Sequence, residues 1–366
     1  MEDIEMITHR REALTPTSHP DRSMSLNQLA SAALTRYKQS GGIKVLEEAI
    51  TYRREALTLC PTGHPNRSKS LSSLASAVII RYQQSGRMQD LVEVITYTRE
   101  ALSLCPIGHP DRSMCLSGLG TAILIRCEQL GSMEDLDEVI TYHREALTLC
   151  PIVGHPMRFY YLNNLARAVF IRYERLGKMK DLEEVITYRR EELTLCPPGP
   201  YRPSSLSGLA KAVLARYKQL GRTEDLEEVI IYRREALTLC PTGHPDCSLF
   251  LDLLASAVLI RYKQLNRLKD LEEGIIYHRE ALHLCPPGHP DRSLSLNDLA
   301  FALLNRYKQL GSMEDLENAI AYNWEALSLR LSVLLATKII SPPSTTLLTQ
   351  FMLAMGSWVG WRISKR

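Results

Sequence analysis

Apolar residues recur along this chain at helical spacing, in pairs of segments separated by short polar connections. In the first complete pair, one apolar face follows the spacing i, i+3, i+4, i+7, i+11 that is typical of a helix packed on one side. Its members are Leu26, Leu29, Ala30, Ala33 and Tyr37. The pattern therefore predicts a helix from about residue 22 to residue 40.

A second apolar face follows directly and predicts a second helix. It ends at Cys60-Pro61, because proline cannot continue a helix comfortably. The face consists of Leu46, Ala49, Ile50, Ala56 and Leu57.

The same pair of segments is repeated about seven times. An arginine followed by an aromatic residue marks each copy, and successive copies are 44 to 46 residues apart. The marks are Arg36-Tyr37, Arg81-Tyr82, Arg172-Tyr173, Arg216-Tyr217, Arg261-Tyr262 and Arg306-Tyr307, with the variant Arg126-Cys127. Because a fixed period of this size is the signature of stacked repeats, the sequence predicts an all-α, right-handed solenoid of antiparallel helix pairs.

The repeats also define the domain organisation. Residues 1–14 match a second helix without its first, residues 15–330 form the array, and residues 331–366 are an irregular apolar tail or cap. Residues 339–361 contain no charged side chain. They predict a capping segment, a disordered tail or a membrane anchor, although Pro342 and Pro343 weaken the last reading.

Helix ends are marked by residues with special backbone preferences. Glycine follows the first helix in six copies, and Asn266 replaces it in the other. Both residue types accept the left-handed conformation beyond a helix end. Aspartates such as Asp90, with a glutamate three residues later, predict N-caps of the second helices.

Three polar columns and one cysteine column repeat with the period. The arginines of the marks and a glutamate column that includes Glu55 and Glu100 predict a ladder of ion pairs between paired helices. Histidines such as His64 precede proline in the connectors and predict a turn. Cysteines such as Cys60 predict small buried residues that close the second helix, and free thiols indicate a reducing compartment.

Composition and motifs argue against several functions. The 44 basic and 41 acidic residues give a net charge of +3, which does not favour nucleic-acid binding. The sequence contains no phosphate-binding loop, dinucleotide fingerprint, zinc-protease motif or nucleophile elbow. We therefore expect neither an enzyme nor a bound cofactor or metal.

One stripe of the first helix, at positions i, i+4 and i+8, varies between copies and lies outside the apolar face. If the first helices line a concave groove, Arg167 and Lys211 give it a positive spot and Phe301 gives it an apolar anchor. Such a groove suits an extended or helical peptide with acidic character, while ordinary solvated positions are the alternative. The expected site comprises Asn163, Arg167, Ile171, Ser207, Lys211, Asp252, Asn297, Phe301 and Asn305.

The helix pair resembles the tetratricopeptide repeat. Ala49, Ala56 and Pro61 stand at the alanine, alanine and proline spacing of that family, and Leu26, Leu29 and Ala30 match its large-large-small pattern. The period here is longer than the family's roughly 34 residues. It is similar to long repeats of mushroom-forming fungi, which often accompany a caspase-like CHAT protease domain.

The resemblance implies protein binding as a class, and the free thiols indicate an intracellular location. We therefore expect a cytoplasmic scaffold that binds a protein or peptide partner, and we expect it to be a monomer. The alternatives are the regulatory array of a CHAT-type cysteine protease and a tail-anchored adaptor that uses residues 339–361. A His and Cys pair encoded beyond Arg366 is the mark of the first alternative, and membrane fractionation tests the second.

Overall fold

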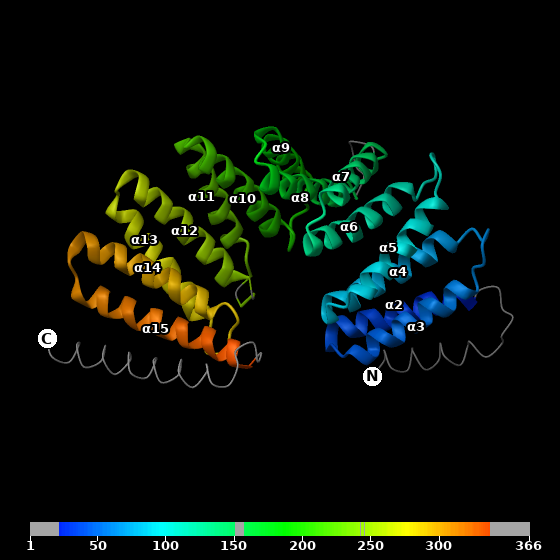
Figure 1. Cartoon of the computed structure of the whole chain (residues 1–366), viewed down its shortest axis with the longest axis horizontal. Helices are drawn as coiled ribbons and strands as arrows, with labels where there is room; N and C mark the ends of the chain where they lie inside the picture. Colours follow the sequence, from blue (N-terminus) through cyan, green and yellow to red (C-terminus); the bar gives the residue numbers. More distant parts are fainter. Residues whose placement is uncertain (1–21, 151–156, 242, 245, 337–366) are drawn as a thin grey trace. The chain divides into compact units, whose positions relative to one another are not determined.

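The computed structural model describes residues 22–150, 157–241, 243–244 and 246–336, and all regular structure within them is helical (Figure 1). The helices come in seven pairs, as the period predicts. They are α2 (Arg22–Ser40), α3 (Ile43–Thr58), α4 (Arg67–Ser85), α5 (Met88–Ser103), α6 (Arg112–Leu130), α7 (Met133–Thr148), α8 (Arg158–Leu176), α9 (Met179–Leu195), α10 (Arg202–Leu220), α11 (Thr223–Thr238), α12 (Cys247–Leu265), α13 (Leu268–Leu284), α14 (Arg292–Leu310) and α15 (Met313–Ala336).

The ends of the array extend differently from the prediction. Helix α15 continues to Ala336, beyond residue 330 where the repeat pattern stops. The half-repeat at residues 1–14 and the apolar segment at residues 339–361 lie outside the described residues.

The described chain divides into two compact units between residues 195 and 196. We call helices α2–α9 the N-terminal unit and helices α10–α15 the C-terminal unit. In each unit, every first helix packs along the second helix of its own pair, and that second helix packs on the next first helix. This is the packing of a tetratricopeptide-like solenoid. The division falls at the one connector that lacks the histidine, Pro198-Gly199-Pro200-Tyr201.

The core is the predicted pair of apolar faces. Leu26, Leu29, Leu46 and Ile50 are almost completely buried, and small alanines such as Ala30 lie where helices approach closely. Equivalent residues are buried in the same way in the later pairs, except that Leu316 and Ile320 of α15 are half-buried. Within each unit, neighbouring pairs therefore cover each other's apolar faces.

The predicted stops of the first helices are confirmed. Gly86 has φ of 65° and Asn266 has φ of 50°, and each backbone N–H donates to the carbonyl of a tyrosine four residues earlier. The predicted N-caps are wrong. Helix α5 begins at Met88 after Arg87, so Asp90 lies inside the first turn, where its carboxylate is free to pair with an arginine.

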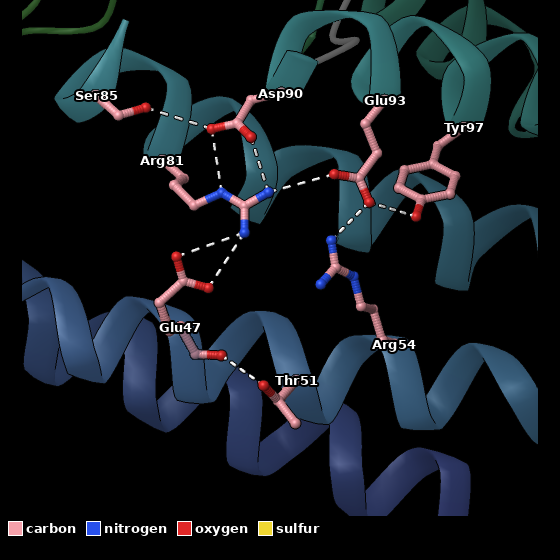
Figure 2. Close-up of polar contacts among 8 residues, drawn as sticks. All are labelled: Glu47, Thr51, Arg54, Arg81, Ser85, Asp90, Glu93 and Tyr97. Atoms are coloured by element: carbon pink, nitrogen blue, oxygen red, sulfur yellow. Dashed lines mark hydrogen bonds and ion pairs between the residues drawn. The ribbon is translucent and has the colours of Figure 1, made fainter. Parts of the chain in front are cut away.

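The predicted ladder of ion pairs is wrong in its partners, because the arginines of the marks bind aspartates and not the predicted glutamate column. Arg81 holds Asp90 through two hydrogen bonds of 2.9 and 3.1 Å, and it also contacts Glu47 of the preceding pair and Glu93 of its own (Figure 2). The network in Figure 2 continues from Glu93 to Arg54 and Tyr97. Each arginine of the marks from Arg81 to Arg306 binds the aspartate nine residues later.

The glutamate column instead binds arginines at the start of the first helices. Glu55 accepts from Arg22 at 2.6 Å and Glu100 accepts from Arg67 at 2.7 Å, across 33 residues of sequence. Arg67 also donates to the carbonyl oxygen of Cys60, which fixes the connector. The array therefore has two separate ion-pair columns, and each joins the two helices of one pair. Contacts such as Arg81 with Glu47 add a link to the preceding pair.

The histidine and cysteine columns are structural, as predicted. The backbone N–H of Asn66 donates to Nδ1 of His64, and the same turn forms at His109, His244 and His289. Seven cysteines are buried free thiols. The expectation of free thiols fails at one place, where Cys240 forms a disulfide with Cys247 across the connector.

Candidate binding groove

Two neighbouring pockets lie between successive first helices of the N-terminal unit. A pocket of about 700 Å³ lies between α2 and α4, and a second of about 440 Å³ lies between α4 and α6 above α5. Lys69 and Ser73 of α4 line both pockets. We call the two together the α4 groove.

The floor of the second pocket is open because of two small residues. Arg53 occupies the equivalent floor position one repeat earlier and donates to the carbonyl oxygen of Ser73, twenty residues later. Thr98 is too short to fill that space, and Gly118 adds no side chain opposite it. A Cβ atom on Gly118 would lie 3.9 Å from Cγ2 of Thr98.

Hydroxyl groups of the variable stripe line the walls. Ser76 donates to the carbonyl oxygen of Ser72 at 2.9 Å, and Thr35 donates to that of Ser31 at 3.0 Å. Since each proton is used within its own helix, the oxygen lone pairs remain as acceptors facing the groove. Such walls suit the N–H donors of a peptide.

The groove also has a cation and an apolar region. Lys69 is exposed, and it is the one charged residue in the linings of these two pockets. Within the described chain it has no ion-pair partner. Ile79, Met114 and Tyr161 contribute apolar surface to the smaller pocket. The groove therefore offers separate positions for a carboxylate and an apolar side chain.

The predicted site residues of the N-terminal unit lie farther along, on α8. Asn163 accepts a hydrogen bond of 2.9 Å from Arg189. Arg167 is exposed but pairs with Glu128 through two contacts of 2.9 and 2.5 Å. Ile171 is half-buried. The charge of Arg167 is thus compensated within the protein.

The other predicted residues belong to the C-terminal unit. Ser207 and Lys211 lie on α10, half-buried and exposed respectively. Phe301 is 47% exposed, and Nζ of Lys263 lies 4.3 Å from the centre of its ring. Asn297 and Asn305 donate to carbonyl oxygens of their own helix.

Asp252 lies in a different environment from the rest of the predicted set. It is buried, 2.8 Å from Nδ1 of His278, and it accepts a hydrogen bond of 2.7 Å from Ser295.

The floor residues Arg53, Thr98 and His143 belong to one column of the repeat, the floor column, which the sequence patterns did not predict as a site. This position follows a tyrosine in every second helix, but its own residue type changes from repeat to repeat. Its members are Arg53, Thr98, His143, Arg189, Arg233, His278 and Asn323. A position whose residue type varies so widely inside a regular repeat was the available signal. Five of its members, Arg53, Thr98, His143, Arg233 and His278, are buried, whereas Arg189 is half-buried and Asn323 is exposed.

His143 is the floor residue of the repeat after Thr98. It is completely buried, and neither ring nitrogen has a hydrogen-bond partner in the described structure. Burial lowers the pKa of His143 to about 4. This imidazole is therefore neutral at physiological pH and fills space that is open beside Thr98.

Membrane insertion has no support from the described helices. None of them combines the length and the apolar character that crossing a bilayer requires.

The fold is similar to solved tetratricopeptide-repeat structures. The C-terminal part of a tetratricopeptide-repeat protein from Cytophaga hutchinsonii matches with a TM-score of 0.52 and 11% identity, over 81% of this chain and 95% of that one. Nearly identical tetratricopeptide-like repeats from Podosopora anserina give 0.42 and 21%, over 60% and 98%.

Sequence comparisons identify no related protein. No protein-family profile and no curated protein matches the chain. The described chain thus has the tetratricopeptide-like solenoid fold.

Proposed function

We propose that this protein is a scaffold whose α4 groove binds an extended peptide segment of a partner protein. The observation that carries the proposal is the pair of adjoining pockets that share Lys69. A peptide carboxylate at Lys69 places the neighbouring residues over both pockets. The solenoid already holds the walls in position, so binding costs little ordering of the scaffold.

Each part of the groove has a separate role in the proposed complex. Peptide N–H groups donate to the hydroxyl oxygens of Ser72, Ser76 and Thr121, and an apolar peptide side chain enters beside Met114. A carboxylate at Lys69 fixes the orientation of the peptide, because the two pockets beside Lys69 differ. The larger pocket is lined by polar residues of α2, and the smaller one contains the apolar side chains named above. The expected ligand is therefore acidic at one position and apolar at a nearby one.

The stripe on the later first helices extends this proposal. Asn163, Arg167 and Ile171 offer further contacts on α8 of the same unit. In the C-terminal unit, Phe301 stacked under Lys263 offers an apolar anchor with a cation beside it. Ser207, Lys211, Asn297 and Asn305 complete that proposed surface.

We also propose that the protein acts as a cytoplasmic monomer. The support is the seven free buried thiols, which are typical of a reducing compartment. Light scattering coupled to size exclusion tests the monomer directly.

A floor substitution tests the groove without unfolding the repeat. Thr98→Arg introduces the residue that the array already holds at the equivalent positions Arg53 and Arg233, so we expect it to fold and to fill the smaller pocket. Lys69→Glu reverses the one charge of the lining. Thr96→Arg, on the exposed face of α5, is the matched control.

The measurement is selection from a random-peptide display library, followed by affinity titration of the enriched peptides. We expect peptides with a carboxylate and a nearby apolar residue. Their affinity should fall at least about tenfold, or 1.4 kcal/mol, in Thr98→Arg and Lys69→Glu, and stay unchanged in Thr96→Arg. Equal affinity for all four proteins, or no enriched peptide, contradicts the proposal.

A further inference from the structure

Three metal-ligating side chains from three consecutive helices meet in the C-terminal unit. Asp252 on α12, His278 on α13 and Asp298 on α14 each place one ligand atom within 4.8 Å of the other two. Nδ1 of His278 and Oδ1 of Asp252 are 2.8 Å apart. His278 is 1% exposed and Asp252 is 8% exposed, whereas Asp298 is half-buried, so the cluster lies mostly inside the protein and reaches toward its surface.

The repeats themselves show how unusual this combination is. His278 is a member of the floor column, and Asp298 stands twenty residues later, where Arg53 and Arg233 find a backbone carbonyl. In the other repeats, the positions of Asp252 and Asp298 hold only uncharged residues. The equivalents of Asp252 are Asn27, Ser72, Ser117, Asn163, Ser207 and Asn297. The equivalents of Asp298 are Gln28, Ser73, Gly118, Asn164, Gly208 and Leu253.

The cluster is short of positive charge. Asp252 and Asp298 each place a carboxylate oxygen within 4.8 Å of a ring nitrogen of His278. Two carboxylates therefore share one imidazole. Charges in a protein interior are expensive unless they are paired or coordinate a metal. A divalent cation supplies the missing charge.

The ligand set and its support fit a transition metal. One imidazole nitrogen with two carboxylate oxygens suits zinc and neighbouring first-row divalent ions, at bond lengths of about 2.0–2.2 Å. Ser295 donates to Oδ2 of Asp252 at 2.7 Å, which orients Oδ1 toward His278. Such hydrogen bonds to ligating carboxylates are typical of metal sites.

We propose that Asp252, His278 and Asp298 bind one divalent transition-metal ion of the zinc class, which ties α12, α13 and α14 together. Bound ligand atoms lie roughly 3.4 Å apart around a tetrahedral ion, so side-chain movement on the order of 1 Å closes the cluster. Three protein ligands leave a fourth position for water. The site adds a cross-link between two repeats that the regular array lacks.

The full chain, treated with a chelator and kept reduced, is titrated with Zn²⁺ by calorimetry and with Co²⁺ by visible absorption. We expect one ion per chain, with d–d bands and without the thiolate charge-transfer band that cysteine ligands would give. Zn²⁺ should also raise the melting temperature.

Asp298→Asn and His278→Gln test the ligands. Asn164 occupies the position equivalent to Asp298, so the first variant is expected to fold. Both variants should bind Zn²⁺ at least about 100-fold more weakly and lose the Zn²⁺-dependent rise in melting temperature. The controls are His283→Gln, on the exposed surface of α13, and Asp291→Asn, at the exposed N-cap of α14, and both should bind as wild type.

Three results overturn the proposal. They are unchanged Zn²⁺ affinity in both ligand variants, a thiolate band in the Co²⁺ spectrum, and absence of stoichiometric binding by the wild type.

Discussion

Gly120 of α6 and His143 of α7 are in direct contact, and the imidazole takes the space of the missing side chain. A Cβ atom on Gly120 would lie 2.9 Å from both Cε1 and Nε2 of His143. Every other repeat has alanine at the position of Gly120. Gly120 therefore leaves the space that the imidazole of His143 occupies.

This contact predicts a pair of compensating substitutions. Gly120→Ala should destabilise the protein by about 1–3 kcal/mol, because the buried ring must shift to admit a methyl group. The same change in a His143→Thr background should cost much less, since Thr98 shows that threonine is accepted at this column. Urea denaturation of the four proteins gives the coupling energy, and additive effects would contradict the contact.

His143 also predicts a specific pH dependence. Its pKa in the folded protein is about 4 instead of 6.5, so the unfolded chain takes up a proton first as the pH falls. The free energy of unfolding should therefore decrease from pH 6.5 downward, by about 3 kcal/mol at pH 4. His143→Thr removes this contribution, and its stability measured across the same range gives the difference. Parallel curves for the two proteins would disprove the assignment.

Arg126 lacks the partner from the preceding pair that Arg261 and Arg306 have, because the residue at that position is Val92. Arg261 donates to Glu227 at 2.7 Å and Arg306 donates to Glu272 at 2.8 Å, each across to the preceding pair. The residue aligned with these glutamates for Arg126 is the exposed Val92. Val92→Glu should stabilise the protein by about 0.5 kcal/mol, and the gain should shrink in high salt. Val92→Gln controls for size, and an equal gain from glutamine would rule out an ion pair.

The two ion-pair columns should differ in their contribution to stability. Side chains of Arg81 and Asp90 are 11% and 6% exposed, whereas those of Arg22 and Glu55 are 21% and 40% exposed. Asp90→Asn should cost about 2–4 kcal/mol, because it leaves a guanidinium partly buried without its full pairing. Glu55→Gln should cost at most about 1 kcal/mol. Thermal and urea unfolding compare them, and equal losses would refute the distinction.

Cys115 should be replaceable by serine at little cost. Its Sγ lies 3.4 Å from that of Cys105, and the aligned residues Ser70 and Ser295 contact the same cysteine column. Burial and the neighbouring thiol raise the pKa of Cys115 to about 12, so its neutral form is the one that packs. Cys115→Ser should cost less than about 1 kcal/mol. Leu116→Ala, at the adjacent buried residue, should cost about 2–5 kcal/mol, and similar losses would contradict this.

The sequence alone determined the helices and their order. Apolar spacing, glycine stops such as Gly86 and connector turns at His64 all act within a few residues, so a local pattern was enough to predict them. The repeat then fixed the stacking, because neighbouring copies bury the same face. Even the exception at Asn266 followed from backbone geometry.

Only the tertiary structure decided which polar side chains meet. Arg81 reaches Asp90 and Glu47, Cys240 reaches Cys247, and Lys69 lies between two pockets, although none of these relations follows from the period. The reason is that these side chains come from helices or connectors that are separate in the local pattern, so packing decides which of them meet. In the floor column, Arg53 and Arg233 reach backbone carbonyls, Thr98 leaves a pocket, and His143 fills the space beside Gly120.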